Sequence, residues 1–258
     1  MLNLIPNSIL LSLGPIKIHW YGFLIFLAFW LAFFISFKRA KKYNLTKDHV
    51  YDLTFWLFLS GLIGARLYHV FSEFSYYWQN PREILFFWQG GLGIYGAILG
   101  GILVLLFWSK KNKKSFLSLL DFYTPLILLG LAIGRWGNFF NQEIYGLPTN
   151  QSWGLFISLE NRVPGYENYS YFHPTFFYES IFCFLLFTLL LLRDRHKKIN
   201  GELLVLAAFF YPLFRFFNEM LRLDYQPIFG GWRLGNWTSF LIFLIAIFLL
   251  LLQKRKRD

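Results

Sequence analysis

Seven long apolar segments, separated by polar connections, make up most of this chain. They extend over residues 19–37, 50–71, 91–108, 117–136, 174–192, 202–221 and 236–252. A helix needs about 20 predominantly apolar residues to cross the hydrocarbon core of a bilayer, and each segment is close to that length. The pattern therefore predicts an all-α integral membrane protein with seven transmembrane helices.

Basic residues follow every second apolar segment. They cluster in the ranges 38–47, 110–114, 193–198 and 254–257, after the first, third, fifth and seventh segments. Because cytoplasmic connections are enriched in Lys and Arg, this alternation predicts an N-terminus outside and a cytoplasmic C-terminus. The net charge of +11 is then largely explained by topology, and we expect no nucleic-acid partner.

The composition agrees with a single polytopic membrane domain over residues 1–258. The chain is 56% hydrophobic and only 15% charged, whereas about 25% of the residues in a soluble domain are charged. The connection over 137–173 is long enough to form a small extracytoplasmic subdomain. Cys183 is the only cysteine, and the five histidines are scattered, so we expect neither a disulfide nor a metal site.

Polar side chains interrupt six of the seven segments, always near the predicted outer end. Ionisable groups inside a membrane are costly and usually face the interior of the helix bundle. Their agreement in position predicts a polar chamber that opens toward the outer leaflet. The residues expected to line it are Tyr21, Arg66, Tyr95, Arg135, Asn138, His173, Glu179, Tyr211, Arg215, Glu219 and Arg222.

The sixth segment carries its polar residues on one stripe. Tyr211, Arg215, Glu219 and Arg222 lie at positions i, i+4, i+8 and i+11, and Arg215 and Glu219 are spaced to pair. Glu219 could be a counter-ion or a catalytic group, and the residues do not choose between these roles. The surplus of arginines suits a planar anion, because guanidinium groups bind phosphate through paired hydrogen bonds. A phospholipid headgroup is the anion available at that depth.

The third segment contains the letters G-x-G-x-x-G within "GGLGIYGAILGG", residues 90–101. A dinucleotide site requires a preceding strand, which a membrane segment does not provide. Small residues also allow two helices to approach closely. We therefore expect these glycines to pack against a neighbouring helix.

The stretch "GRWGNFFNQEIYG", residues 134–146, ends the fourth segment with an unusual density of polar residues. It satisfies every fixed position of G-R-x-G-N-F-x-N-x-E-x-x-G, the signature of the bacterial prolipoprotein diacylglyceryl transferases. The stretches "GPIKIHWYG" at 14–22, "HPTFFYE" at 173–179 and "YPLFRFFNEMLR" at 211–222 also resemble blocks of that family, in the same order. The resemblance covers nearly the whole chain.

The resemblance implies an activity, its substrates and a location. Members of the family move the sn-1,2-diacylglyceryl group from phosphatidylglycerol to the lipobox cysteine of a prolipoprotein signal peptide, which begins lipoprotein maturation. They release glycerol phosphate and need no cofactor. The expected location is the bacterial inner membrane, among membrane lipids, with the active site toward the outer leaflet. The family's functional residues correspond here to Tyr21, Arg135, Asn138, Glu143, Tyr211, Arg215, Glu219 and Arg222.

One position departs from the family pattern. Some members carry a histidine, proposed as a base, where this chain has Tyr95. We expect Arg135 and Arg215 to bind the phosphate, with Asn138 and Tyr21 supplying neutral hydrogen bonds. Glu143 or His173 could accept the proton of the incoming thiol, and both alternatives stay open.

Two other classes of protein are compatible with interior arginines. An anion or lipid transporter would place polar residues near the midplane and often shows repeated halves, whereas here the polar set is one-sided. A structural membrane subunit would have no use for so many buried ionisable groups. The sequence favours the transferase.

Overall fold

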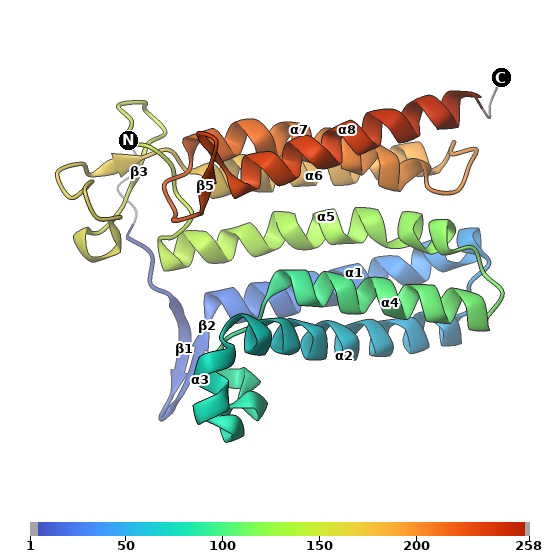
Figure 1. The fold of residues 1–258 in the computed structure, drawn as a ribbon, viewed down its shortest axis with the longest axis horizontal. Helices are drawn as coiled ribbons and strands as arrows, with labels where there is room; N and C mark the ends of the chain where they lie inside the picture. The colour runs from blue at the N-terminus through green and yellow to red at the C-terminus, as the bar shows by residue number, and fades with distance from the viewer. Residues whose placement is uncertain (1–4, 256–258) are drawn as a thin grey trace. The chain divides into compact units, whose positions relative to one another are not determined.

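The computed structural model describes residues 5–255, and seven of its helices are long and apolar enough to cross a membrane. They are α1 (Trp20–Ala40), α2 (Lys47–Ser72), α4 (Ile94–Lys111), α5 (Phe116–Asn141), α6 (Thr175–Asp194), α7 (Glu202–Leu221) and α8 (Leu234–Arg255) (Figure 1). The predicted all-α, seven-span fold is thereby confirmed. The orientation of the termini stays a prediction, and Lys256 and Arg257 of the last basic cluster lie outside the described residues.

Shorter elements precede the first long helix and connect the others. The strands form three antiparallel hairpins: β1 (Ile9–Leu13) with β2 (Ile16–His19), β3 (Leu155–Phe156) with β4 (Tyr171–Phe172), and β5 (Ile228–Phe229) with β6 (Trp232–Arg233). The remaining elements are the helix α3 (Phe74–Gln79) and the 3₁₀ turns η1 (Lys41–Tyr43), η2 (Pro81–Leu85), η3 (Phe87–Gln89) and η4 (Leu159–Asn161).

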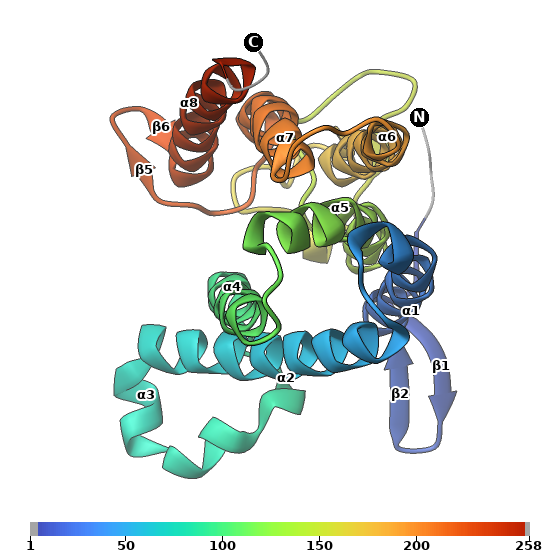
Figure 2. The same cartoon turned by 90° about the vertical axis from the view of Figure 1, so that its right-hand side faces the viewer.

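The chain divides into two compact units, and the first contains the residues up to 35 and those from 123 onward. In this unit α7 lies between α6 and α8 (Figure 2). Its apolar core joins α5, α6 and α7 through residues such as Leu129, Leu186 and Leu203. Cys183 is fully buried in that core, as expected of a small apolar residue.

The second unit contains residues 36–122 and is built on the contact of α2 with α4. A side chain added at Gly96 would lie 2.0 Å from the backbone oxygen of Gly64, and one at Gly100 would lie 2.5 Å from that of Ser60. Only glycine permits backbones to approach so closely. The predicted packing role of the glycine-rich segment is confirmed.

The segment after α5 begins later than predicted. Helix α5 continues through Asn141, so residues 137–141 are helical, and the connection to α6, which contains β3, η4 and β4, extends from 142 to 174. Its core is the buried cluster of Tyr145, Leu155, Ile157 and Phe172, against which Phe176 of α6 packs. The side of the membrane on which this segment lies stays a prediction.

Candidate active site

The end of α5 folds back on itself and brings the polar residues of the 134–146 stretch together. Gln142 has a left-handed backbone, with φ of 51°, and the backbone N–H of Glu143 donates to the carbonyl of Asn138 at 3.0 Å. The carboxylate Oε1 of Glu143 consequently accepts hydrogen bonds from Asn138 at 2.8 Å and from Asn141 at 3.2 Å. Gln142 instead points inward and accepts from the backbone N–H of Ser158 at 2.7 Å.

Two arginines from different helices meet at one carboxylate. Arg135 of α5 donates from Nη2 to Oε1 of Glu179 on α6 at 2.8 Å, and Arg215 of α7 donates from Nη1 to Oε2 of the same residue at 2.8 Å. The hydroxyl of Tyr211 donates to Oε1 at 2.7 Å. Asn138 joins this group because its Oδ1 accepts from Arg135 at 3.3 Å. The predicted convergence of Arg135 and Arg215 is thus present within the first unit.

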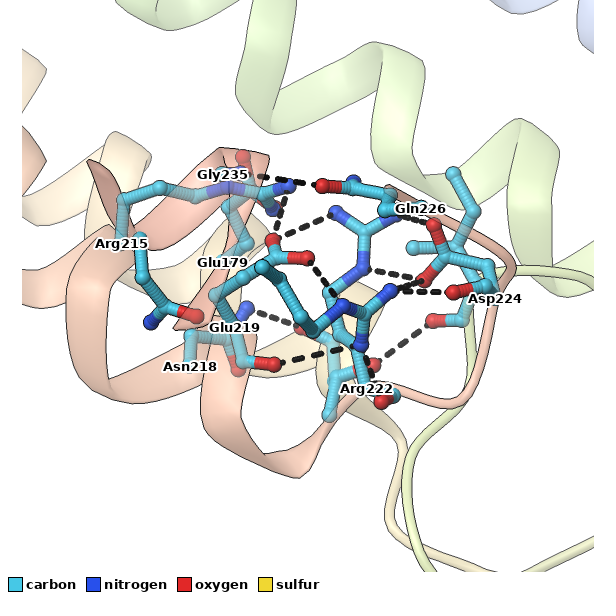
Figure 3. Close-up of polar contacts among 12 residues, drawn as sticks. Glu179, Arg215, Asn218, Glu219, Arg222, Asp224, Gln226 and Gly235 are labelled. Atoms are coloured by element: carbon cyan, nitrogen blue, oxygen red, sulfur yellow. Dashed lines mark hydrogen bonds and ion pairs between the residues drawn. The ribbon is translucent and has the colours of Figure 1, made fainter. Parts of the chain in front are cut away.

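A second carboxylate, Glu219, lies beside Arg215 and Arg222 (Figure 3), and Arg233 is a third arginine close to it. Its oxygens are 2.6 Å from Nη2 of Arg215, 3.2 Å from Nε of Arg233 and 3.6 Å from Nη1 of Arg222. The predicted pairing of Arg215 with Glu219 is confirmed. None of these contacts has the alignment of a hydrogen bond, and both carboxylate oxygens are buried. Glu219 is therefore held mainly by the charges around it.

The connection from α7 to α8 is tied to this second carboxylate. Arg222 donates two hydrogen bonds to Asp224, at 2.7 and 2.8 Å, and Arg233 donates to the backbone carbonyls of Arg222 and Asp224. Burial opposes ionisation of Asp224, but the hydrogen bonds and charge of Arg222 and the charge of Arg233 outweigh it. The pKa of Asp224 is lowered as a result.

Together these contacts form one continuous network. It begins at Glu143 and continues through Asn138, Arg135, Glu179 and Arg215 to Glu219, and from there to the α7–α8 connection. The Glu179 and Glu219 side chains are 0% exposed, whereas those of Arg135 and Arg215 are 18% and 14% exposed. The carboxylates therefore anchor the guanidinium groups from the buried side. Buried charges are stable in such an arrangement only when they are paired.

Two glycines of the 134–146 stretch permit close packing around the network. A side chain at Gly137 would lie 2.2 Å from the ring of Tyr21. Glycine at this position, between Arg135 and Asn138 in the sequence, therefore allows the Tyr21 ring of α1 to pack against α5. A side chain at Gly146 would lie 2.6 Å from the carbonyl oxygen of Leu221, where the chain pairs with the end of α7. Larger residues at either position would force these segments apart.

Three other residues predicted to line the chamber have partners of their own. His173 is paired through Nδ1 with the hydroxyl of Tyr178 at 3.0 Å, and its backbone bonds to Gly146 and Leu147. Arg66 and Tyr95 belong to the second unit. There Arg66 donates to backbone carbonyls of residues 83, 84, 90 and 91, and so binds the α2–α4 connection to α2. Whether any of the three contacts substrate stays a prediction.

Asp224 and Arg233 are part of the network but were missed by the sequence reasoning. Both lie in a connection where charged residues are ordinarily solvated, and no helical spacing relates them to Glu219. The position of Asp224 two residues after Arg222 was the only available signal. Among residues 5–255, no group of three or more His, Cys, Asp or Glu side chains could hold a metal ion.

The fold and this site define a multi-pass membrane protein with a buried arginine–carboxylate network. The family model for prolipoprotein diacylglyceryl transferase matches residues 8–252. The chain therefore belongs to the prolipoprotein diacylglyceryl transferase family.

Similar proteins carry the name phosphatidylglycerol–prolipoprotein diacylglyceryl transferase. The one from Trichormus variabilis is 41% identical over 85% of this chain and 80% of its own length. The one from Synechocystis is 37% identical over 98% of this chain and 93% of its own length. The one from Oceanobacillus iheyensis is 34% identical over 96% and 88%, respectively.

Proposed function

We propose that this chain transfers the sn-1,2-diacylglyceryl group of phosphatidylglycerol to the lipobox cysteine thiol in the signal peptide of a prolipoprotein. The products are a thioether-linked lipid and glycerol phosphate. Membership of the family and the names of the relatives support this proposal. The observation that carries it is the meeting of Arg135 and Arg215, from two helices, at Glu179.

Arg135 and Arg215 bind the lipid phosphate in this proposal. Glu179 occupies their buried edges, and their partial exposure leaves other N–H groups able to reach a ligand. Tyr21 and Asn138, which flank Arg135, supply neutral hydrogen bonds to the headgroup.

The reaction is a substitution at the glyceryl carbon. The thiolate sulfur forms the new C–S bond while the bond from that carbon to the phosphate oxygen breaks, and the electron pair leaves with the phosphate. Negative charge grows on the leaving oxygens, where preorganised guanidinium groups stabilise it more strongly than water does. Arg135 and Arg215 thus favour the transition state over the bound lipid.

Glu143 accepts the thiol proton in this scheme. It is exposed, its Oε1 is held by Asn138 and Asn141, and its Oε2 accepts no hydrogen bond from the described residues. His173 is the weaker alternative, because its ring is already paired with Tyr178. The proton-accepting group therefore lies on the same helix end as Arg135.

The orientation follows from the alternation of basic clusters, and the inner-membrane location follows from the family. We place the chain in the bacterial inner membrane, with the ends of α5 and α7 that carry the network toward the outer leaflet. Phosphatidylglycerol would then reach the network from that leaflet, and the prolipoprotein after its signal peptide has crossed the membrane.

The test uses the purified full chain in phosphatidylglycerol vesicles with a synthetic lipobox peptide. We expect release of glycerol phosphate and a peptide whose mass increases by one diacylglyceryl group. A peptide with serine in place of cysteine is the matched control and should remain unmodified. If intact lipid crossed the bilayer and no glycerol phosphate appeared, the transporter interpretation would replace this one.

A further inference from the structure

A groove lies at the opposite end of the first unit's helices from the arginine network. It has a volume of 370 Å³ and lies between α6, α7 and α8, with apolar walls formed by Leu189, Leu206, Phe210 and Leu250. Along α6 its polar end at Arg193 is about 21 Å from Glu179, at 1.5 Å per helical residue. The groove is therefore separate from the proposed active site.

The polar end of the groove combines one neutralised carboxylate with two cations. The Glu202 side chain is 3% exposed and lies 2.5 Å from Arg193, and it also accepts from the backbone N–H of Lys198 at 3.2 Å. Lys254 is exposed and lines the groove, and no ion pair or hydrogen bond joins its side chain to another described residue. The Arg193 side chain is 36% exposed. Among the described residues that line the groove, Arg193 and Lys254 are the cations and Glu202 is the anion, so one positive charge remains.

The position and shape of the groove fit a phospholipid. Its apolar walls extend about 12 Å along α7 from Glu202 to Phe210, at 1.5 Å per residue, which suits the first part of an acyl chain. Arg193 and Lys254 lie in the last turns of α6 and α8, where a membrane helix reaches the headgroup region. Basic pockets between membrane helices are known to bind anionic headgroups.

We propose that this groove binds one anionic phospholipid, with an acyl chain between α6, α7 and α8 and its phosphate at Arg193 and Lys254. The single excess positive charge matches the single negative charge of a phosphodiester. An ammonium headgroup gains nothing here, because Glu202 is buried and already paired. This lipid is held and not consumed, so the proposal does not rest on the proposed transfer reaction.

The test measures lipid retained by the purified full chain in native mass spectrometry. The probe is dioleoyl phosphatidylmethanol, which has a phosphodiester and no other charged group, and dioleoyl phosphatidylcholine is the zwitterionic comparison. We expect preferential retention of the anionic lipid. Lys254→Gln should weaken that retention about fivefold, as expected for one lysine near a charged surface, and Lys254→Arg should restore it.

A second variant fills the groove. Leu250→Trp should lower the number of retained anionic lipids by one, whereas Leu251→Trp, on the exposed neighbouring position, and Lys110→Gln, at the end of another span, should retain as many as wild type. Equal retention of the two lipids by wild type would overturn the proposal. So would wild-type retention by both Lys254→Gln and Leu250→Trp. Competition by millimolar inorganic phosphate alone would assign the groove to a small anion and reject the lipid.

Discussion

The two carboxylates of the network are equally buried but are held in different ways. Glu179 accepts aligned hydrogen bonds from Arg135, Arg215 and Tyr211, which come from two neighbouring helices. Glu219 has three arginines within 4.0 Å, yet its oxygens accept no aligned hydrogen bond from any described residue. Aligned hydrogen bonds fix the orientation of a carboxylate, whereas nearby charges without such bonds fix only its approximate position. The difference suggests that the Glu179 half sets the geometry of the reaction and that the Glu219 half fastens the α7–α8 connection.

The partners of the two carboxylates support the same distinction. Arg135 and Arg215 bind Glu179 with side-chain atoms alone and remain partly exposed. The guanidinium group of Arg233 pairs with Glu219 and donates to backbone carbonyls of the α7–α8 connection. A cation that binds the protein's own backbone has fewer donors left for a ligand. The predictions below test this division of roles.

The largest effect on the transfer rate is expected when a guanidinium group that binds Glu179 is replaced by an ammonium group. Arg135→Lys and Arg215→Lys should each lower the rate of glycerol phosphate release about 100-fold or more, because a lysine cannot make paired hydrogen bonds to phosphate. Arg195→Lys makes the same substitution just after the other end of α6, and this matched control should be as active as wild type. A variant at either site with near-normal turnover would contradict the phosphate role.

A direct comparison of the carboxylates should give the next largest effect. Glu179→Gln replaces the carboxylate that accepts from both arginines with a neutral amide. We expect transfer to fall about 100-fold, because a misplaced arginine donor costs about as much as one that is removed. Glu219→Gln loses no aligned hydrogen bond, and we expect a smaller fall of about tenfold, equal to 1.4 kcal/mol. The transfer rates of the two variants and wild type are compared at a temperature at which thermal unfolding shows all three to be folded. Equal losses in the two variants would remove the distinction.

A smaller effect on transfer is expected from a substitution in the α7–α8 connection. Arg233→Gln should destabilise the protein by about 1.5–3 kcal/mol, the range for hydrogen bonds that involve a charged group, as measured by thermal unfolding in detergent. Transfer should fall less than in Arg135→Lys. The exposed Arg82→Gln serves as the control. If Arg233→Gln instead raised KM for phosphatidylglycerol with no loss of stability, Arg233 would be a ligand to the lipid.

The smallest effect is expected from pH. Because the pKa of Asp224 is lowered in the folded protein, its pair with Arg222 adds stability that is fully present above the unfolded pKa, near 3.9. That stability is lost as the pH falls through the lower, folded pKa. Asp224→Asn should therefore be less stable than wild type at pH 7 by about 1 kcal/mol, and the gap should close below about pH 4. A constant gap over this range would show that the charge of Asp224 is not its source.

Much of the fold could be read from the order of residues, because crossing a membrane depends on local composition. All seven spans were found within a few residues of the helices that form, and the glycines of the third span were recognised as packing residues. The end of α5 was placed too early, at 136. Polar residues such as Asn138 reduce the hydropathy of its last turn, although the hydrogen bonds of the helix continue to Asn141.

The sequence by itself determined the membrane class, the family and the set of polar residues near the ends of the spans. Only the tertiary structure decided how those residues pair: Arg66 with backbone carbonyls of its own unit, Arg135 and Arg215 with Glu179, and Arg233 with Glu219. Hydropathy and helical spacing act over one segment, so they are visible in the order of residues. An ion pair depends on which segments meet, and Glu179 lies 44 residues from Arg135 and 36 from Arg215, a separation that packing alone overcomes.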